Sequence, residues 1–486
     1  MLPPTDDPVC APARHPVRRA VGLACAATLL AACSAPLPYV ARDPGLDAAR
    51  AGFAARRLDD TALTAFLAQA GASVPGDGQP WDFDTLALVA AWHSDDVAAA
   101  RVRWMSALER QRSGPPPQLT GLDLLLDPHT VTDALRPQPW TLGLGLEWLL
   151  PSERRLAARQ GVLDSAELQA RIELAQAIWR VRVRVREPWS AALELDAQLA
   201  LAASTLALDG ERARRIDVRV RHGEAAAADA VAARLAQAQA QTALEQLERQ
   251  RDASHAALRA ALGLPADGPA VPLQRAGGGV PLLPAAAAQQ AAALDNRLDL
   301  RAAEARFQAA DADLRWEVAQ QYPDMLLKPG YEWDQGDHRL RIGLSLPLAL
   351  PRAHRPQVEQ AQAEREARAR ELQGRQVAVI QELALARRAV GDAVAERAEL
   401  QQLVVLAEQA WQLSLRAEAL GETDPLQSSV AAQAVLAQRR QLALADHDLA
   451  RRVAALEDAV QRPLHELVQI ARASGAPTAA REEAQP

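Results

Sequence analysis

WTLGLGLEWLLP, residues 140–151, has the pattern of a β-strand in a chain of 486 residues whose other long segments have the pattern of helices. One face of the stretch is wholly apolar and carries Trp140, Leu142, Leu144, Leu146 and Trp148. Thr, Gly, Gly and Glu lie between them. Such alternation predicts a strand with one apolar face. Eight steps of about 3.3 Å span roughly 26 Å, which matches the apolar band of an outer-membrane β-barrel with its aromatic girdles.

The same pattern returns 200 positions later as RLRIGLSLPLALP, residues 339–351. Its apolar face carries Leu340, Ile342, Leu344 and Leu346. Each copy is preceded by another alternating run, so we predict two pairs of strands, within 118–151 and 324–350. Glycine turns at 222–224 (HGE) and 420–422 (LGE) lie 198 positions apart. The nearly constant offset indicates an internal duplication.

Helices are predicted on either side of the strand pairs: one at 81–112 in the first repeat, one that ends at Tyr322 in the second, and long ones after the strands. Residues 224–262 contain no glycine or proline, and residues 357–424 contain no proline. A continuous helix over the second stretch would extend about 100 Å, so it needs partner helices along its length. Apolar spacings of three and four with many alanines favour coiled-coil packing. Residues 179–189, WRVRVRVREPW, alternate like a strand, but we predict helix there, kinked or interrupted at Pro188.

The predicted fold class is mainly α with a small β part, built from a duplicated helix, strand, strand, helix order. Glycine and proline mark the boundary between the two copies, because they end helices and form loops. We expect a lipoprotein signal peptide (1–32), an N-terminal periplasmic segment (33–80), a first repeat (81–265), a linker (266–284), a second repeat (285–463) and a flexible tail (464–486).

The N-terminal segment has the features of a bacterial lipoprotein signal. Arg18 and Arg19 precede an apolar run at 20–30 that is too short to span a bilayer. The run ends in LAAC, residues 30–33, which is the pattern of a lipoprotein cleavage site. The alternative is an ordinary signal peptide with an incidental cysteine. We predict that Cys33 is the acylated first residue of the mature chain, and Ser34 after it favours the outer membrane.

Four strands cannot close a barrel, and an open sheet edge in lipid leaves backbone groups without hydrogen bonds. Several chains would therefore have to contribute strands if the sheet lies in a membrane. Three chains would supply twelve strands, enough for a barrel with a lumen, and twelve long helices to continue it. The polar strand faces would line water. A small soluble sheet packed on helices is the alternative for such short strands.

Taken together, these features resemble the outer-membrane efflux proteins typified by TolC. The resemblance covers nearly all of residues 81–463. It rests on YPDMLLKPGYEW (322–333), IGLSLPLALP (342–351), DLRAAEARFQAADADL (299–314), AALRAALGLP (256–265) and the two glycine turns. It implies a homotrimer with a 12-stranded outer-membrane β-barrel continued by a long periplasmic α-helical coiled-coil barrel. It also implies docking to a periplasmic adaptor and an inner-membrane transporter.

In that family the two glycine turns form the periplasmic tip. The resemblance therefore implies adaptor-docking and pore-mouth residues at the turns, namely Gly223, Glu224, Ala225, Gly421, Glu422 and Thr423. In well-known members an acid six positions after the glycine takes part in gating. Asp229 holds that place in the first repeat, but Gln427 holds it in the second, so Asp424 is the candidate substitute. Asp229 and Asp424 are thus candidate pore-mouth acids.

Other function classes fit less well. A net charge of -7 with both signs interleaved argues against nucleic acid as a partner. HELVQ, residues 465–469, keeps only half of a zinc-protease motif, because Gln469 stands where the second histidine would be. We expect no enzyme activity, no cofactor and no metal site. The main alternative is a periplasmic coiled-coil lipoprotein acting as an envelope scaffold, with a lipoprotein enzyme as a distant third; the repeated strand pairs favour the channel.

Overall fold

The computed structural model describes residues 45–76, 78–115, 119–128, 140–274, 286–322, 324–334, 337–346 and 351–461. The chain divides into two units, residues 1–52 and 53–486. Of the first unit the structure describes the start of helix α2 (Leu46–Ala55), which buries none of its side chains. The predicted signal peptide, Cys33 and the predicted tail at 464–486 lie outside the described residues.

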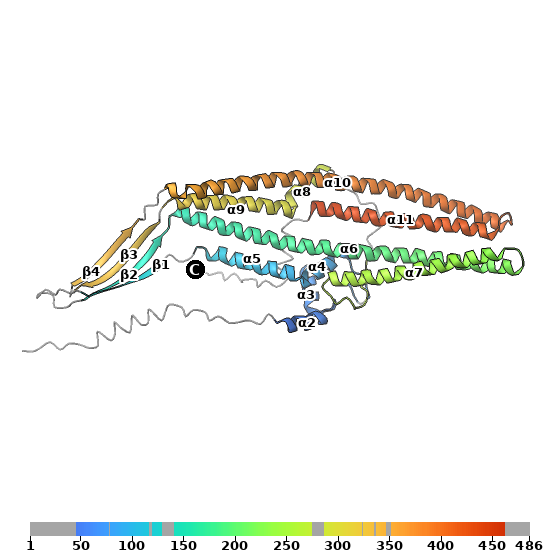
Figure 1. Ribbon diagram of the computed structural model, residues 1–486, viewed down its shortest axis with the longest axis horizontal. Coiled ribbons are helices and arrows are strands. Elements are labelled where there is room, and N and C mark those ends of the chain that lie inside the picture. Colours follow the sequence, from blue (N-terminus) through green and yellow to red (C-terminus); the bar gives the residue numbers. More distant parts are fainter. Residues whose placement is uncertain are drawn as a thin grey trace, which may run out of the picture. The chain divides into compact units, whose positions relative to one another are not determined.

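Four long helices dominate the second unit. Helices α6 (Glu153–Arg221) and α10 (Pro351–Ala419) have 69 residues each, or about 100 Å. Each is followed by a shorter antiparallel partner, α7 (Ala227–Ala261) and α11 (Pro425–Val460). Packing joins α6 to α7, α10 to α11, and α6 to α11. The sheet lies beyond one end of α6 and α10, and the two turns lie at the other (Figure 1).

The predicted helix at 179–189 is confirmed, but an interruption at Pro188 is not found, because α6 continues through this residue. Val181 and Val185 are buried at the spacing of one helical turn. The arginines between them point to charged partners, among them Asp84 for Arg182. Helix α10 begins at Pro351, six residues before the predicted start, and it includes Pro356. A proline at the first helical position costs little because its missing N–H has no partner there anyway.

Three short helices precede the sheet in this unit: α3 (Thr61–Gln69), α4 (Phe83–His93) and α5 (Asp95–Ser113). Helices α4 and α5 pack on α6, and α3 packs on α4. The sequence predicted one helical segment at 81–112, but Ser94 breaks it, because its hydroxyl accepts a hydrogen bond from Val97 N at 3.4 Å and caps α5. Leu63, Leu86 and Leu174 are fully buried in this core.

The first described part of the predicted linker packs in the same core. Trp81 N donates to Pro272 O at 2.9 Å, and Gln274 N donates to Trp81 O at 2.8 Å. Val271 is buried beside this short parallel bridge. Residues 266–274 therefore lie against the helices of the first repeat, and residues 275–285 lie outside the described part.

The second repeat has a matching pair of shorter helices, α8 (Ala286–Asn296) and α9 (Leu298–Gln320). They meet at Arg297, where the sequence predicted one continuous helix. Helix α9 packs on both α6 and α10. A separate apolar core joins α10 to α11 through Val379, Leu383, Val390, Leu449 and Leu456.

One antiparallel sheet contains all four described strands in the order β1 (Leu119–Pro128), β2 (Trp140–Leu150), β3 (Met325–Asp334) and β4 (Asp337–Ser345). Both predicted strand pairs are confirmed, and the β2–β3 pairing joins the two repeats. Its register sets Leu144 against Leu124 on one side and Tyr331 on the other. In the described part of the chain, β1 and β4 each keep one edge without a partner strand.

Candidate channel wall and helical tips

The apolar face of the sheet is exposed in the single chain. Every residue predicted for it has between 40% and 86% of its surface accessible: Trp140, Leu142, Leu144, Leu146, Trp148, Leu340, Ile342, Leu344 and Leu346. Leu346 lies one residue beyond the end of β4. Leu122, Leu124 and Leu126 of β1 extend the same face. A soluble sheet normally packs such a face on a core, so this face requires an apolar environment outside the chain.

Charged side chains on the opposite face are paired with one another. Lys328 of β3 pairs with Glu147 of β2, and Arg341 of β4 pairs with Glu332 of β3. Arg339 lies 2.9 Å from Asp334, which also accepts a hydrogen bond from Thr141 Oγ1 at 2.7 Å. These pairs link β2 to β3 and β3 to β4. The two faces thus differ in the way that a wall between lipid and water requires.

Glycines on the polar face make room for these long side chains. Gly121 is opposite Glu147, and Gly343 is opposite Lys328. A Cβ at Gly143 would lie 2.9 Å from the Cβ of Leu125, which is closer than ordinary carbon contacts. A glycine in a strand permits such close approach of its neighbours. These glycines therefore lie on the polar face, where side chains of the neighbouring strands come close to them.

Both predicted tip turns are built on a glycine in the left-handed region. Gly223 has φ 75° and Gly421 has φ 76°, which other residues adopt at a cost. After each glycine a backbone N–H reaches back into the helix: Glu224 N donates to Arg219 O at 2.8 Å, and Glu422 N donates to Ala417 O at 2.9 Å. This is the hydrogen-bond pattern of a Schellman helix end.

The tips are open to solvent. A Cβ added at Gly223 or Gly421 would meet no atom within 4 Å, and Glu224 and Glu422 are exposed. Thr423 is half-buried, and its hydroxyl is buried without a hydrogen-bond partner. The glycines are therefore required by the backbone and not by crowding, and the surface around them is accessible to another protein.

The two candidate pore-mouth acids have structural partners. Asp424 accepts a hydrogen bond from Leu426 N at 2.9 Å and caps α11, and it pairs with Arg219. These two contacts hold the pKa of Asp424 below its ordinary value. Asp229 is exposed and accepts from Ala226 N at 3.2 Å, at the start of α7. Each carboxylate thus stabilises a helix end, and their role at a pore mouth remains a proposal.

Arg219 was missed by the sequence prediction. It reaches from the end of α6 to Asp424 at the start of α11, and it lies 4.0 Å from Glu224. Arg215, one turn earlier, lies 4.0 Å from Glu418. The available signal was the contrast between a basic end of α6 and acidic residues around the second glycine turn. Through these pairs the two helical hairpins are connected at their tips.

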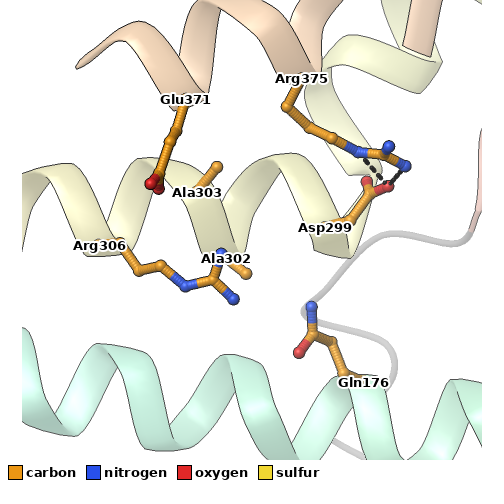
Figure 2. Close-up of a pocket in the computed structure, with 7 residues that line it drawn as sticks. All are labelled: Gln176, Asp299, Ala302, Ala303, Arg306, Glu371 and Arg375. Carbon is orange, nitrogen blue, oxygen red and sulfur yellow. Dashed lines mark hydrogen bonds and ion pairs between the residues drawn. The ribbon is translucent and has the colours of Figure 1, made fainter. Parts of the chain in front are cut away.

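A cavity of about 360 Å³ lies between α6, α9 and α10, nearer to the sheet end of α6 and α10 than to the tip (Figure 2). Its lining carries Gln176, Asp299, Ala302, Ala303, Arg306, Glu371 and Arg375. Burial favours a raised pKa for Asp299, but hydrogen bonds from Arg297 and Arg375 outweigh it and lower that pKa. The charges therefore balance within the wall of the cavity. Within the described residues no cluster of three His, Cys, Asp or Glu side chains could hold a metal ion.

Comparisons with known proteins show which family and which solved structures this chain resembles. Residues 290–460 match the profile of a family described as outer membrane efflux protein. A comparison with curated protein sequences finds no match. The fold is shared with three solved structures among others: the outer membrane protein VceC of Vibrio cholerae, the CmeC outer membrane channel of Campylobacter jejuni, and the open state of the MtrE outer membrane channel of Neisseria gonorrhoeae.

These three structures cover most of both chains. VceC is 20% identical with a TM-score of 0.59, and the match covers 79% of this chain and 96% of VceC. CmeC is 11% identical with a TM-score of 0.58, over 81% and 89% of the two chains. MtrE is 15% identical with a TM-score of 0.60, over 78% and 88%. At these identities the likeness establishes the fold, and it confirms the predicted combination of a small sheet and long paired helices.

Proposed function

We propose that this protein is the outer-membrane exit duct of a tripartite efflux or secretion system. The support is that residues 290–460 match the outer membrane efflux protein family and that the chain has the fold of solved outer membrane channels. A periplasmic adaptor and an inner-membrane transporter would deliver its substrates. The observation that supports this most strongly is the two-sided sheet, apolar and exposed on one face and ion-paired on the other. It continues directly into helices of about 100 Å.

A closed wall requires more than one copy. The sheet has two edges without a partner strand in the described residues, at β1 and β4. Unpaired backbone groups in lipid cost several kcal/mol each, in round terms. Three copies joined edge to edge would give twelve strands and no edge. The chain would then be a homotrimer in the bacterial outer membrane, with its helical part in the periplasm.

The row of long helices also has an uncovered side at each of its two ends. The packing order α7, α6, α11, α10 leaves α7 and α10 as the outer members of the row. Val231 and Leu235 on α7 are 65% and 58% exposed. On α10, Leu406 and Leu413 are 59% and 63% exposed, and Leu420, one residue beyond the end of this helix, is 74% exposed. These leucines recur every seven residues, as in a coiled-coil seam. In a ring of three chains, α7 of one copy would pack on α10 of the next.

Disulfide cross-linking tests this closure. Val231 and Leu413 each lie 8 residues from the glycine of their own turn, so they have the same height above the tip. We expect Val231→Cys with Leu413→Cys to give covalent dimers and trimers on a denaturing gel after oxidation. The mature chain would offer no cysteine besides Cys33 to compete.

A matched control keeps Val231→Cys and moves the second cysteine to Leu385, which is 70% exposed on the same helix. It lies 28 residues farther from the turn, or about 40 Å. This pair is expected to remain monomeric on the gel. Equal cross-linking by both pairs, or none by the first, would contradict the α7–α10 contact.

Cys33 is proposed as a lipid anchor in addition to the barrel. The support is LAAC at residues 30–33 after a short apolar run. One acylated terminus gives an added anchor and does not span the membrane. We expect Cys33→Ser to leave an unprocessed precursor, which intact-mass spectrometry would detect. A mature N-terminus at another residue in the unaltered protein would exclude the lipoprotein assignment.

The exposed turns are proposed as the docking tip for the adaptor. The residues concerned are Gly223, Glu224, Gly421, Glu422 and Thr423. Support comes from their exposure and from the open space around both glycines. Asp229 and Asp424 lie beside these turns, where threefold symmetry would gather them into rings of negative charge that attract cations.

A further inference from the structure

The cavity between α6, α9 and α10 contains an arginine without an acidic partner. Three of its four charged side chains are paired: Asp299 pairs with Arg375, and Glu371 lies 2.9 Å from Arg368, which is outside the cavity. Arg306 lines the same cavity, and in the part of the chain that the structure describes no carboxylate pairs with it. A guanidinium carries five N–H donors in a planar fork that fits a carboxylate. Arg306 is therefore available to bind an anion.

Gln176 provides a hydrogen-bond acceptor across the cavity from Arg306. It belongs to α6, whereas Arg306 belongs to α9, and both side chains extend toward the space between these helices (Figure 2). Gln176 Nε2 donates to Leu298 O at 3.2 Å, which fixes the amide and leaves its Oε1 without a donor among the described residues. A ligand that contacts both side chains thus needs an anionic group for Arg306 and a hydrogen-bond donor for Gln176.

The rest of the lining favours a small ligand with a single negative charge. Ala302 and Ala303 are buried and give the cavity an apolar side. A volume of about 360 Å³ has room for about a dozen groups the size of water, at about 30 Å³ each. Asp299 and Glu371 line the same cavity and repel a second negative charge. The lining therefore suits a short aliphatic monocarboxylate better than hydrogen phosphate.

We propose that this cavity binds a small aliphatic monocarboxylate that also carries a hydroxyl group. The carboxylate accepts two parallel hydrogen bonds from Arg306, and the hydroxyl donates to Gln176 Oε1. The aliphatic part lies against Ala302 and Ala303. Arg306 and Glu371 are exposed, so the ligand enters from solvent without separation of the helices.

The donor is a hydroxyl and not an ammonium group for a physical reason. An ammonium carries three N–H donors and a full charge, and Gln176 offers one neutral acceptor. The carboxylates of Asp299 and Glu371 are already occupied by arginines. Burying an ammonium there would leave its charge without compensation. The site therefore distinguishes a hydroxy acid from the corresponding amino acid.

Ligand-observed saturation-transfer NMR on the full-length protein in detergent tests the proposal. Lactate is the first probe, with an expected Kd on the order of 1 mM. Propionate lacks the hydroxyl and is expected to bind about fivefold more weakly, because one hydrogen bond is lost. Alanine replaces the hydroxyl with an ammonium group, and inorganic phosphate at pH 8 carries a second negative charge. Both are expected to bind more weakly than lactate.

Four variants assign the contacts. Arg306→Gln is expected to weaken lactate binding at least about tenfold, and Arg306→Lys, which keeps the charge and loses the planar fork, to have an intermediate effect. Arg315→Gln is the matched control, because Arg315 lies on the same helix, is exposed and pairs with Asp311; it is expected to bind lactate normally. Gln176→Met keeps the side-chain length and is expected to make lactate and propionate bind equally.

Circular dichroism of each variant shows whether its helices are folded. In folded protein, four results would each overturn the proposal: no saturable lactate binding, lactate binding unchanged by Arg306→Gln, propionate as tight as lactate in the unaltered protein, or tighter binding of alanine or phosphate than of lactate. None of these measurements uses conductance, and the site lies in the helices and not in the sheet. Failure of the channel assignment therefore leaves this inference standing, and failure of lactate binding leaves the proposed channel standing.

Discussion

Leu124→Arg is expected to abolish assembly of the trimer in the outer membrane. Leu124 is 75% exposed on the apolar face of the sheet, directly opposite Leu144. A charge at the middle of the bilayer on that face costs about 2 to 4 kcal/mol per chain, and three copies would each bear it. The measurement is the amount of heat-resistant trimer in isolated outer membranes.

Its matched control is the neighbouring residue. Asp123 lies on the same strand, is also exposed, and faces Gly145 on the polar side of the sheet. Asp123→Arg therefore introduces the same side chain one residue away, toward water instead of lipid. We expect near-normal trimer from this variant. Equal loss from both would show that the two faces do not differ in environment, and the membrane barrel would be excluded.

Gly421→Trp is expected to stop export without lowering the amount of trimer. At φ 76° any L-residue is strained by about 1 to 2 kcal/mol, which a trimer of this size tolerates. No atom lies within 4 Å of the added Cβ, so the indole projects outward from the tip, where the adaptor would dock. Export is measured as resistance to, or secretion of, the cognate substrate, and we expect it to fall to the level of cells that lack the protein.

Gly421→Ala separates strain from bulk, because it has the same backbone cost and almost no protruding side chain. Export by Gly421→Ala is expected to stay close to normal. If alanine is as harmful as tryptophan, the strain of the turn explains the loss and not a blocked contact. If tryptophan leaves export intact, the docking surface lies elsewhere.

Strands, long helices and tip turns could be predicted because each depends on a local pattern. Period-two alternation located the four described strands; the lack of glycine and proline over 224–262, and of proline over 357–424, indicated α7 and most of α10. The two turns were located by glycine at equivalent positions of a repeat. Patterns of this kind depend on backbone geometry and on burial of one face, which neighbouring residues determine together.

Contacts between distant residues could not be predicted in this way. Arg219 and Asp424 are 205 residues apart, and their pairing depends on how two hairpins align. The same is true of His447 and Glu194, whose Nε2 and Oε2 atoms lie 2.9 Å apart. Ser94 was overlooked for a different reason: both sides of it have strong helical patterns, and only its capping hydrogen bond shows that two helices meet there. The linker, rich in Pro and Gly, gave no sign that Val271 would be buried.

A periplasmic scaffold built of coiled coils remains the main competing function. It would account for the four long helices and for a lipid anchor. It gives no reason for a sheet that exposes one continuous leucine and tryptophan face while every described arginine and lysine on the other face is paired with an acid. A scaffold in water would gain stability by covering that face.

Single-channel recording in planar lipid bilayers tests the central claim most directly. The purified full-length protein is predicted to insert as a unit and to give stable, uniform conductance steps, because three sheets would close a water-filled barrel whose polar face carries the paired charges. Protein that binds the bilayer but never produces discrete current steps, in the presence or absence of its adaptor, would contradict the account.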